Sequence, residues 1–330
     1  MEAGLCGLGV VLLTMGCGRY ADFTLPPAEG GHAVQWEWFA DPRPVLTPSE
    51  WASRDVLNPS VVARESALFN FYSGFDGATW HTALATSRDG IEWQTHGIVL
   101  SPDRNSWEGD YIAANGTALW SGGAFLYWYQ AGPKGRTRIG LARSRDGRTW
   151  TRETNPVLDF GPRGGWDEIS LGDPYVTSIG DFFYLYYLGQ DRARRQRLGL
   201  ARSRDGVHWQ KLRANPVLEL GGYDAFDEAG LGEPAVWRSH GSYWMLYTGR
   251  DRSERRRMGM AGSANGVEWR RVPPVIAGEH EWNSAVVCDA TVLPGNGHVR
   301  VWFGGGNRPS PDENLNGAIG VAYLRATLAK

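Results

Sequence analysis

One short motif recurs four times along this chain at an almost constant interval. Its form is Ser-x-Asp-Gly-x-x-Trp, with Asn in place of Asp in the last copy. The copies occupy Ser87–Trp93, Ser144–Trp150, Ser203–Trp209 and Ser263–Trp269. Their glycines, at positions 90, 147, 206 and 266, follow one another at nearly equal distances along the chain. A fixed period of this length is typical of folds built from repeated supersecondary units, so one architecture must accommodate every copy.

Each copy of the motif follows a segment with the composition of a β-strand. Asp-Gly and Asn-Gly favour a tight hairpin turn, because the central residues of that turn need positive φ. The preceding aromatic segments, with a fifth near the end of the chain, are Phe69–Ser73, Phe125–Tyr129, Phe182–Tyr187, Tyr243–Tyr247 and Val299–Phe303. With about four strands in each interval and no helical periodicity, the pattern predicts an all-β, five-bladed β-propeller of four-stranded antiparallel blades.

We expect this propeller to form a single domain over residues 45–330. Residues 18–44 would then be a linker, in which Val34–Phe39 is a candidate for the strand that closes the ring. The repeated motifs themselves are expected to be structural, with Ser and Asp stabilising each turn and Trp packing between blades. Four copies spaced around a ring cannot all belong to one active site.

The amino-terminal segment Met1–Cys17 predicts an export signal. Within it, Gly4–Gly16 is apolar but too short to span a bilayer. Leu12–Cys17 (LLTMGC) resembles a bacterial lipoprotein box, in which the cysteine becomes the lipid-carrying first residue. We therefore expect an exported protein anchored to the cell envelope through Cys17; the alternatives are an ordinary signal peptide and a mis-assigned start. Cys288 would then lack an intrachain partner, which excludes a disulfide framework and a cysteine-based metal site.

A second series of residues keeps the same period, at the start of the first strand of each predicted blade. Its members are Asn58, Asn115, Asp173, Glu233 and Asp289, again at nearly equal intervals. Because the first strand of a propeller blade lines the central channel, the five side chains are expected to converge on one axis. Three acids in such a pocket would perturb one another's pKa values, as acid–base catalysis at neutral pH requires.

With these motifs the chain resembles the five-bladed propeller glycosidases, namely glycoside hydrolase families 43, 32 and 68 and the related families 130 and 117. The resemblance covers nearly the whole chain after residue 45. It implies that Glu233, in Gly-Glu-Pro, is the general acid that protonates the leaving oxygen. It also implies that Asp173, in Gly-Asp-Pro, orients the sugar and tunes the pKa of Glu233. The sugar, the linkage and the stereochemical outcome stay open.

The first predicted blade departs from the family pattern, which has an aspartate as general base where this chain has Asn58. An amide cannot accept the proton, and glycoside hydrolysis usually needs two carboxylates. The acids expected on the same face are Asp55, Glu108, Asp110 and Asp289. The sequence leaves the choice among them open, together with a differently activated water and a site that no longer hydrolyses.

The loops that lead into the inner strands combine an aromatic ring with acids or amides, as in Trp107–Asp110 and Trp166–Glu168. Aromatic faces stack on sugar rings, and carboxylates accept hydrogen bonds from hydroxyl groups. The candidate substrate contacts are therefore Asp55, Asn58, Trp107, Asp110, Asn115 and Trp166. The alternative is that the rings fill gaps between blades while the acids form solvated caps.

Three basic segments fall between the second and third strands of successive blades, at residues 134–138 (KGRTR), 191–197 (DRARRQR) and 251–257 (DRSERRR). Strand alternation places them on the same face as the inner series. Because a guanidinium group fits carboxylate or phosphate, Arg192 and Arg250 are candidate contacts to an anionic sugar or, as in family 130, to phosphate. The alternative is a set of solvated hairpin tips paired with local acids.

These observations lead to the hypothesis of a glycosidase that acts on an oligo- or polysaccharide in the axial pocket. The alternatives are a non-catalytic carbohydrate-binding propeller at the cell surface, motivated by Asn58, and a phosphorylase. A net charge of −2 argues against a nucleic-acid partner, and membrane contact is expected only through the lipid anchor. The seven histidines lack metal-ligand spacing, so no metal site or cofactor is predicted, although the resemblance leaves calcium in the channel open.

Overall fold

The computed structural model of the protein describes residues 18–28, 34–295 and 297–328. Within these ranges all regular structure is β-strand, apart from one short 3₁₀ turn, η1 (Glu281–Asn283), so the predicted all-β class is confirmed. No helix in the described ranges has the length and apolar character needed to cross a membrane. The predicted export signal, with Cys17, lies outside the described residues.

The strands follow the sequence repeat, and successive strands within each interval pair antiparallel. The first group contains β3 (Asp55–Leu57), β4 (Val61–Arg64), β5 (Ala67–Phe75), β6 (Trp80–Ser87) and β7 (Gln94–Leu100). The second contains β8 (Ile112–Ser121), β9 (Ala124–Gly132), β10 (Arg138–Ser144) and β11 (Thr151–Arg152). The third contains β12 (Ser170–Ile179), β13 (Phe182–Gln190), β14 (Gln196–Ser203) and β15 (Gln210–Leu212).

Two further groups complete the strand order. The fourth contains β16 (Gly230–Ser239), β17 (Ser242–Arg250), β18 (Arg256–Ser263) and β19 (Arg270–Ile276), and the fifth contains β20 (Val286–Pro294), β21 (His298–Gly306) and β22 (Ala318–Leu328). Short parallel pairings of β6 with β8 and of β18 with β20 join neighbouring groups at their edges, which gives sheets of five, nine and eight strands. The five aromatic segments singled out in the sequence lie in β5, β9, β13, β17 and β21, which directly follow the innermost strands of their groups.

The amino-terminal segment packs against the strand groups at two places. β2 (Val34–Ala40), which covers the expected strand at Val34–Phe39, pairs antiparallel with β22. β1 (Tyr20–Ala21) pairs parallel with β15. Between them Leu25 is fully buried, and its side chain lies against Gly266 of the last turn motif. Residues 18–28 and 34–40 therefore contribute to packing as well as connecting the domain to the segment before it.

Each Ser-x-Asp-Gly turn is held by the same hydrogen bonds. In the first copy Ser87 Oγ accepts from the N–H of Gly90, and Asp89 Oδ1 accepts from the N–H groups of Ile91 and Glu92. Gly90 has a φ of +72°, which glycine adopts without steric cost. The other three copies repeat these contacts, with Asn265 in the place of the aspartate in the last. The Ser and Asp of the motif thus stabilise the turn locally.

The turn glycines also connect neighbouring groups of strands. Trp128 in β9 donates its indole N–H to the carbonyl of Gly206 at 2.8 Å, and Trp302 in β21 donates to Gly90 at the same distance. Tyr186 in β13 donates to the carbonyl of Gly266 at 2.6 Å. These aromatic side chains are fully buried, so each bond joins a turn to the core of an adjacent group.

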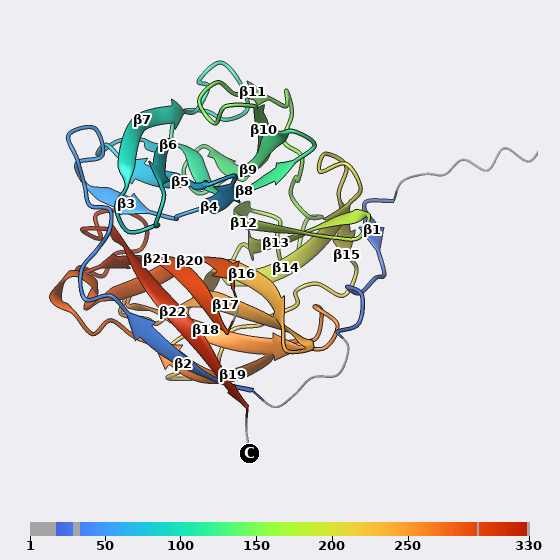
Figure 1. Cartoon of the computed structure of the whole chain (residues 1–330). Helices are drawn as coiled ribbons and strands as arrows, with labels where there is room; N and C mark the ends of the chain where they lie inside the picture. Colours follow the sequence, from blue (N-terminus) through green and yellow to red (C-terminus); the bar gives the residue numbers. More distant parts are fainter. Residues whose placement is uncertain (1–17, 29–33, 296, 329–330) are drawn as a thin grey trace, which may run out of the picture.

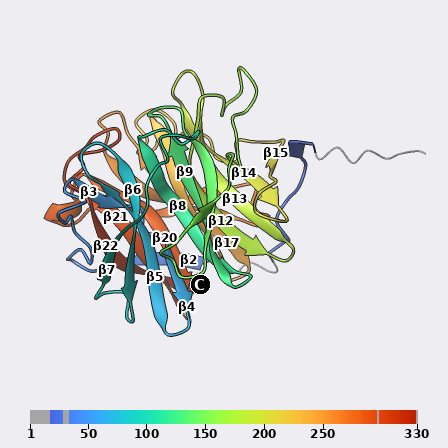
Figure 2. The same ribbon diagram turned by 90° about the horizontal axis from the view of Figure 1, so that it is seen from above.

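The arrangement of the groups brings one strand of each to the middle of the molecule. Figure 1 shows β4, β8, β12, β16 and β20 nearest the centre, with the later strands of each group farther out. The apolar core fills the spaces between the faces of neighbouring groups. In Figure 2 long loops project from the same side of the strands. Residues at the start of the inner strands therefore share one central region.

Gly206→Ala tests how closely a motif turn packs on the next group of strands. Gly206 has a φ of +75°, and a Cβ there would lie 2.7 Å from Cζ2 of Trp128. We expect the free energy of unfolding to fall by about 2–4 kcal/mol, because a left-handed backbone cost adds to overpacking of the core. Chemical denaturation monitored by tryptophan fluorescence measures this loss.

Gly122→Ala is the matched control for this substitution. Gly122 has a φ of +60°, and nothing lies within 4 Å of a Cβ built there. The free energy of unfolding of Gly122→Ala should therefore fall only by the cost of the left-handed backbone, about 1–2 kcal/mol. Equal losses in the two variants would show that the contact between the turn and Trp128 adds nothing to stability.

Candidate active site

The five inner positions share one unusual backbone conformation. The φ angles of Asn58, Asn115, Asp173, Glu233 and Asp289 lie between 47° and 57°. Residues other than glycine rarely occupy this left-handed region, at a cost of about 1–2 kcal/mol each. The strand register shifts at the last four positions, and the strand is interrupted between β3 and β4 at the first. Such a bulge re-aims a side chain relative to the regular pleat.

All five side chains line one cavity of about 610 Å³. This volume lies within the range of about 300–1,000 Å³ that is usual for sites that bind small molecules. The same five residues also line a small cavity of about 30 Å³. The structure therefore brings together the series that the sequence repeat singled out, although its first and last members, Asn58 and Asp289, are far apart in the chain.

Backbone N–H groups of one inner strand hold the carboxylates of the strand before it. The N–H of Glu233 donates to Asp173 Oδ2 at 3.3 Å, and the N–H of Asp289 donates to Glu233 Oε2 at 3.3 Å. The N–H of Asn58 donates to Asp289 Oδ2 at 3.2 Å. The three acids are thus connected in series through the main chain, with Glu233 between the other two.

Asp173 is perturbed by this surrounding. Burial and the charge of Glu233 raise its pKa from the ordinary 3.8 to about 7. The N–H of Glu233 and the side chain of Asn115 donate hydrogen bonds to the carboxylate and oppose the shift, but they do not cancel it. Asp173 can therefore change its protonation state near neutral pH, which is the property expected of a group that tunes an acid catalyst.

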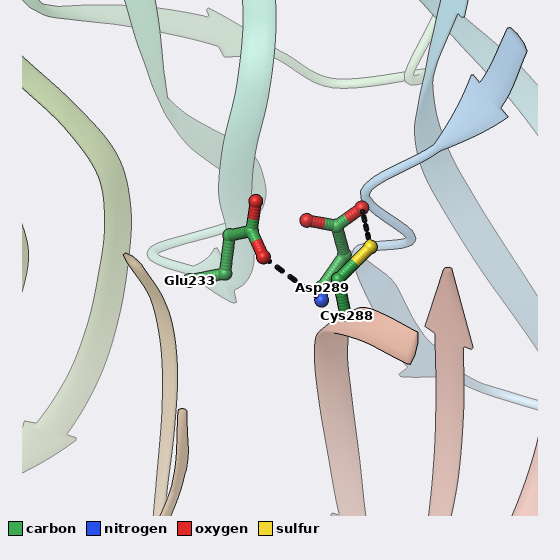
Figure 3. A group of neighbouring side chains, drawn as sticks. All are labelled: Glu233, Cys288 and Asp289. Atoms are coloured by element: carbon green, nitrogen blue, oxygen red, sulfur yellow. Dashed lines mark hydrogen bonds between the residues drawn. The ribbon is translucent and has the colours of Figure 1, made fainter. Parts of the chain in front are cut away.

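Glu233, Cys288 and Asp289 form a tight cluster at one side of the cavity, shown in Figure 3. One side-chain O or S atom of each lies within 4.8 Å of the others. The Cys288 thiol donates to Asp289 Oδ2 at 3.1 Å, while Asp289 Oδ1 is buried without a hydrogen-bond partner and points toward Glu233. Burial and the charge of Glu233 raise the pKa of Asp289 well above its usual value. The geometry fits a carboxyl pair that keeps one proton between its members.

The same cluster has the spacing of a metal site, which the sequence did not predict, but its chemistry is poorly suited to a cation. Burial, together with the charge of Asp289, raises the pKa of the Cys288 thiol well above its usual value and so opposes the thiolate that binds metals. A positive charge is also already present, because Nη1 of Arg256 lies 4.0 Å from Oε1 of Glu233.

Arg256 is a residue of the site that the sequence analysis missed. Burial disfavours its charge, but the attraction of Glu233 and the neighbouring acids outweighs burial and raises the pKa of the guanidinium group. It is the first residue of β18, at the inner end of the 251–257 segment. The third group has Gln196 at the corresponding first position of β14, and Gln196 lines the cavity as well. The first residue of the third strand thus lines the cavity in both groups, and this shared position could have identified Arg256 from the sequence.

The two arginines predicted as ligand contacts line the cavity but have protein partners. Arg192 Nε lies 3.1 Å from Glu168. Arg250 donates to Glu254 at 2.9 Å and to Gln196 at 3.0 Å. Both guanidinium groups can reach a bound molecule only together with, or in exchange for, these contacts.

Asp55 is not at the cavity, because its carboxylate is used to hold a loop. The side chain is fully buried, and it accepts from the N–H groups of Asn314, Leu315 and Gly317 at 2.6, 2.9 and 2.8 Å. A carboxylate with three backbone donors is satisfied within the fold. The structure thus gives Asp55 a structural position in place of the predicted contact with substrate.

Trp107, Asp110 and Trp166 also lie outside the cavity lining. Trp107 packs against the core of the second group. Trp166 is 5.5 Å from the ring of Tyr187 and lies over two glycines of the third group, where any larger residue would clash with it. Asp110 is exposed and accepts a hydrogen bond only through its main-chain carbonyl, from Thr79. For the two rings the alternative interpretation, that they fill gaps between strands, fits the structure.

The acids beside these rings are buried in a repeated contact set, not in solvated caps. Glu108 bonds to Tyr129 and Arg152, Asp167 to Tyr187 and Lys211, and Asp227 to Tyr247 and Arg271. Each acid thus receives one tyrosine hydroxyl and one cation from the strands beside it. Because the set recurs in three groups, it is part of the architecture and leaves these acids unavailable to substrate.

Comparison with known proteins identifies the class of fold. Residues 68–221 match the family model described as "Glycosyl hydrolases family 32 N-terminal domain". A solved structure named "Glycoside hydrolase" superposes with a TM-score of 0.69 at 17% identity, covering 91% of this chain and 92% of the other. A β-1,2-mannobiose phosphorylase from Listeria innocua superposes with a TM-score of 0.68 at 12% identity, covering 88% and 97%.

Together these matches show that the chain has the glycoside hydrolase-like propeller fold, and they confirm the predicted resemblance to propeller glycosidases. The uncharacterized protein Rv1502 of Mycobacterium tuberculosis is a relative by sequence. It is 25% identical over 220 residues, which cover 62% of this chain and 72% of the relative. Proteins of this fold include both hydrolases and phosphorylases, so the fold alone does not choose between the two reactions.

Asp173→Asn tests the buried acid of the site through the pH dependence of stability. In the folded protein the pKa of Asp173 is raised from 3.8 to about 7. The unfolded chain releases this proton at lower pH, so the free energy of unfolding falls as the pH rises from about 4 to about 7. The asparagine variant has no group that titrates at this position, so its free energy of unfolding should fall less over that pH range. Chemical denaturation at several pH values measures the difference.

Asp181→Asn removes an acid that is 87% exposed and serves as the control. It should retain the pH dependence of the unchanged protein. If Asp173→Asn retained that dependence as well, Asp173 would not be a buried acid with a raised pKa.

Proposed function

We propose that this protein is a glycoside hydrolase that cleaves an oligo- or polysaccharide in the cavity lined by its inner strands. One observation carries the proposal: Glu233 lies between Asp173 and Asp289, on three successive inner strands that open on one cavity of about 610 Å³. Carboxyl groups held close together cannot all ionise, so a protonated acid and an ionised base coexist near neutral pH. Hydrolysis of a glycosidic bond usually needs that combination.

The roles of the three acids follow from their contacts. Glu233 gives its proton to the leaving oxygen, and Arg256 beside it stabilises the carboxylate that remains. Asp173 holds the sugar and keeps the site proton-rich, since its own pKa is raised to about 7. Asp289 takes the place of the missing aspartate at Asn58, and it is the ionised carboxylate in the form of the pair in which Glu233 holds the shared proton. Among the acids considered from the sequence, Asp289 lines the cavity while Asp55, Glu108 and Asp110 do not.

We also propose that the propeller has five blades in a closed ring, within one domain over residues 45–330. Each inner strand contacts the next, from β4 to β8, β12, β16 and β20, and β20 in turn contacts β4. β2 pairs with β22 as the outermost strand of the last group, which fits its predicted role in closing the ring. The near-constant period of the sequence motifs supports the same count.

The cellular place of the protein is proposed from the sequence. The apolar segment Gly4–Gly16 followed by Cys17 supports export and a lipid anchor on that cysteine. A glycosidase held at the cell envelope would meet oligosaccharides from outside the cell.

Glu233→Gln and Asp289→Asn test the assignment of the acid and the second carboxylate. Both changes keep side-chain size and remove the ionisable group. We expect each to lower turnover by about 10²–10⁴-fold, the usual contribution of general acid–base catalysis, with folding and sugar binding retained. Release of reducing sugar from a broad glycan panel measures turnover, and glycan-array binding measures affinity.

Glu65→Gln and Asp110→Asn are matched controls, because Glu65 is 80% exposed on a turn and Asp110 lies outside the cavity lining. Both should keep full turnover. A Glu233→Gln variant as active as the unchanged protein would overturn the assignment. Binding without product in the unchanged protein would instead identify a carbohydrate-binding propeller. Product that forms only with added phosphate, and that falls when Arg192 or Arg250 is changed to alanine, would identify a phosphorylase.

A further inference from the structure

Residues 307–317 connect β21 to β22 and form a strap beside the cavity. Pro311 and Asp312 of the strap line the cavity together with Tyr111 and Lys134 of the second group. The strap therefore leaves the fifth group, passes the first and reaches the second. A hairpin between adjacent strands needs only two to five residues, so this connection is long enough to contact other groups of strands.

The carboxyl-terminal end of the strap is fixed by the buried Asp55. Its carboxylate accepts three backbone N–H groups, from Asn314, Leu315 and Gly317, at 2.6–2.9 Å. The side chain of Leu315 is fully buried in an apolar cluster that includes Trp80 and Ile112. Charge-assisted hydrogen bonds and apolar burial together fix this end of the strap to the first group and its neighbours.

The middle of the strap is fixed by the arginine of the active site. Nη2 of Arg256 donates to the carbonyls of Ser310 at 3.3 Å and Pro311 at 2.8 Å. The same guanidinium group lies 4.0 Å from Glu233 through Nη1. The position of the strap is therefore linked to the proposed acid by one rigid, planar group.

The outer part of the strap is clasped to the second group by charge. Lys134 Nζ lies 2.6 Å from Glu313 and 3.6 Å from Asp312. The hydroxyl of Tyr111 donates to the other oxygen of Glu313 at 3.1 Å, and Lys134 Nζ lies 5.3 Å from the tyrosine ring. These contacts of Lys134 and Tyr111 with Glu313, here called the clasp, join the strap of the fifth group to the second group.

We propose that the strap is a fixed wall that closes one side of the cavity, so that the site takes the end of a sugar chain and not its interior. This inference rests on the proposed hydrolase function and specifies its mode of attack. A chain bound by its interior must leave the site in two directions, and the wall occupies one of them. Lys134 and Glu313 are then the residues that determine specificity, because they hold the wall against the second group.

The first test measures whether the strap is fixed. In hydrogen–deuterium exchange on the unchanged protein, the amides of Asn314, Leu315 and Gly317 should exchange as slowly as those of the strands beside them. Lys134→Met and Glu313→Gln remove the charges of the clasp with little change in side-chain size. Each should raise exchange across residues 310–313 by about threefold, the scale expected for the loss of an exposed ion pair. Fast exchange of the strap amides in the unchanged protein would contradict the proposal that the strap is a fixed wall.

The second test measures the products. Linear furanoside and β-1,2-mannoside oligosaccharides, labelled at the reducing end, are digested and their lengths followed with time. The unchanged protein should shorten each chain stepwise and release mono- or disaccharides from the start. In Lys134→Met and Glu313→Gln the share of longer products should rise by about threefold, the same scale as the ion pair that is lost.

Arg213→Ala breaks an exposed ion pair with Asp22 away from the cavity and should leave the product pattern unchanged. If the unchanged protein cleaved the oligosaccharides at internal bonds, the proposed wall would be wrong, while the proposed hydrolase function would be supported. A complete lack of product from every oligosaccharide would count against the proposed function itself. The two failures are therefore distinguishable.

Discussion

The site depends on one kind of hydrogen bond, the one from the backbone N–H of an inner residue to the carboxylate of the strand before it. These bonds join Asp173 to Glu233, Glu233 to Asp289 and Asp289 to Asn58. The three donors, Glu233, Asp289 and Asn58, all have the left-handed conformation, in which the N–H is directed toward the preceding inner strand. That conformation costs about 1–2 kcal/mol at each residue, and strain of this kind is usual at functional sites. The conformation that positions the acids is thus also what connects the strands.

Electrostatics at the centre follow from crowding. Three carboxyl groups and one guanidinium group line the same cavity. Arg256 opposes the shifts, but burial together with the charge of Glu233 raises the pKa of Asp173 to about 7 and that of Asp289 well above its usual value. The raised pKa values of Asp173 and Asp289 therefore keep protonated carboxyl groups at the centre near neutral pH. Asn58 fits this balance, because a fourth carboxylate beside Asp289 would add to the repulsion among the acids.

The sequence predicted the strands, their turns and the five inner residues because these recur with one period, and a repeat can be recognised without knowing the fold. It could not predict the roles of single side chains that meet across groups. Asp55 was expected near the ligand, but its partners come from residues 314–317, remote in sequence, and hold it elsewhere. Trp107 packs into the apolar core, and Asp110 is exposed outside the cavity lining. Arg256 was overlooked among many arginines, since only the folded structure places its guanidinium group beside Glu233 in the cavity. The local sequence pattern determines the backbone conformation of a segment. The burial of a side chain and its charged partners depend on how the groups of strands pack together.

Arg256 joins the strap to the proposed acid, Glu233. Through Nη2 it holds the carbonyls of the strap, and through Nη1 it lies beside Glu233. A buried guanidinium group is planar and has few alternative positions, so a displacement of the strap must move the charge next to the acid. The wall of the cavity and the position of the charge beside Glu233 therefore cannot vary independently. A sugar that presses on Pro311 would therefore act on the chemistry at Glu233 as well as on the shape of the pocket.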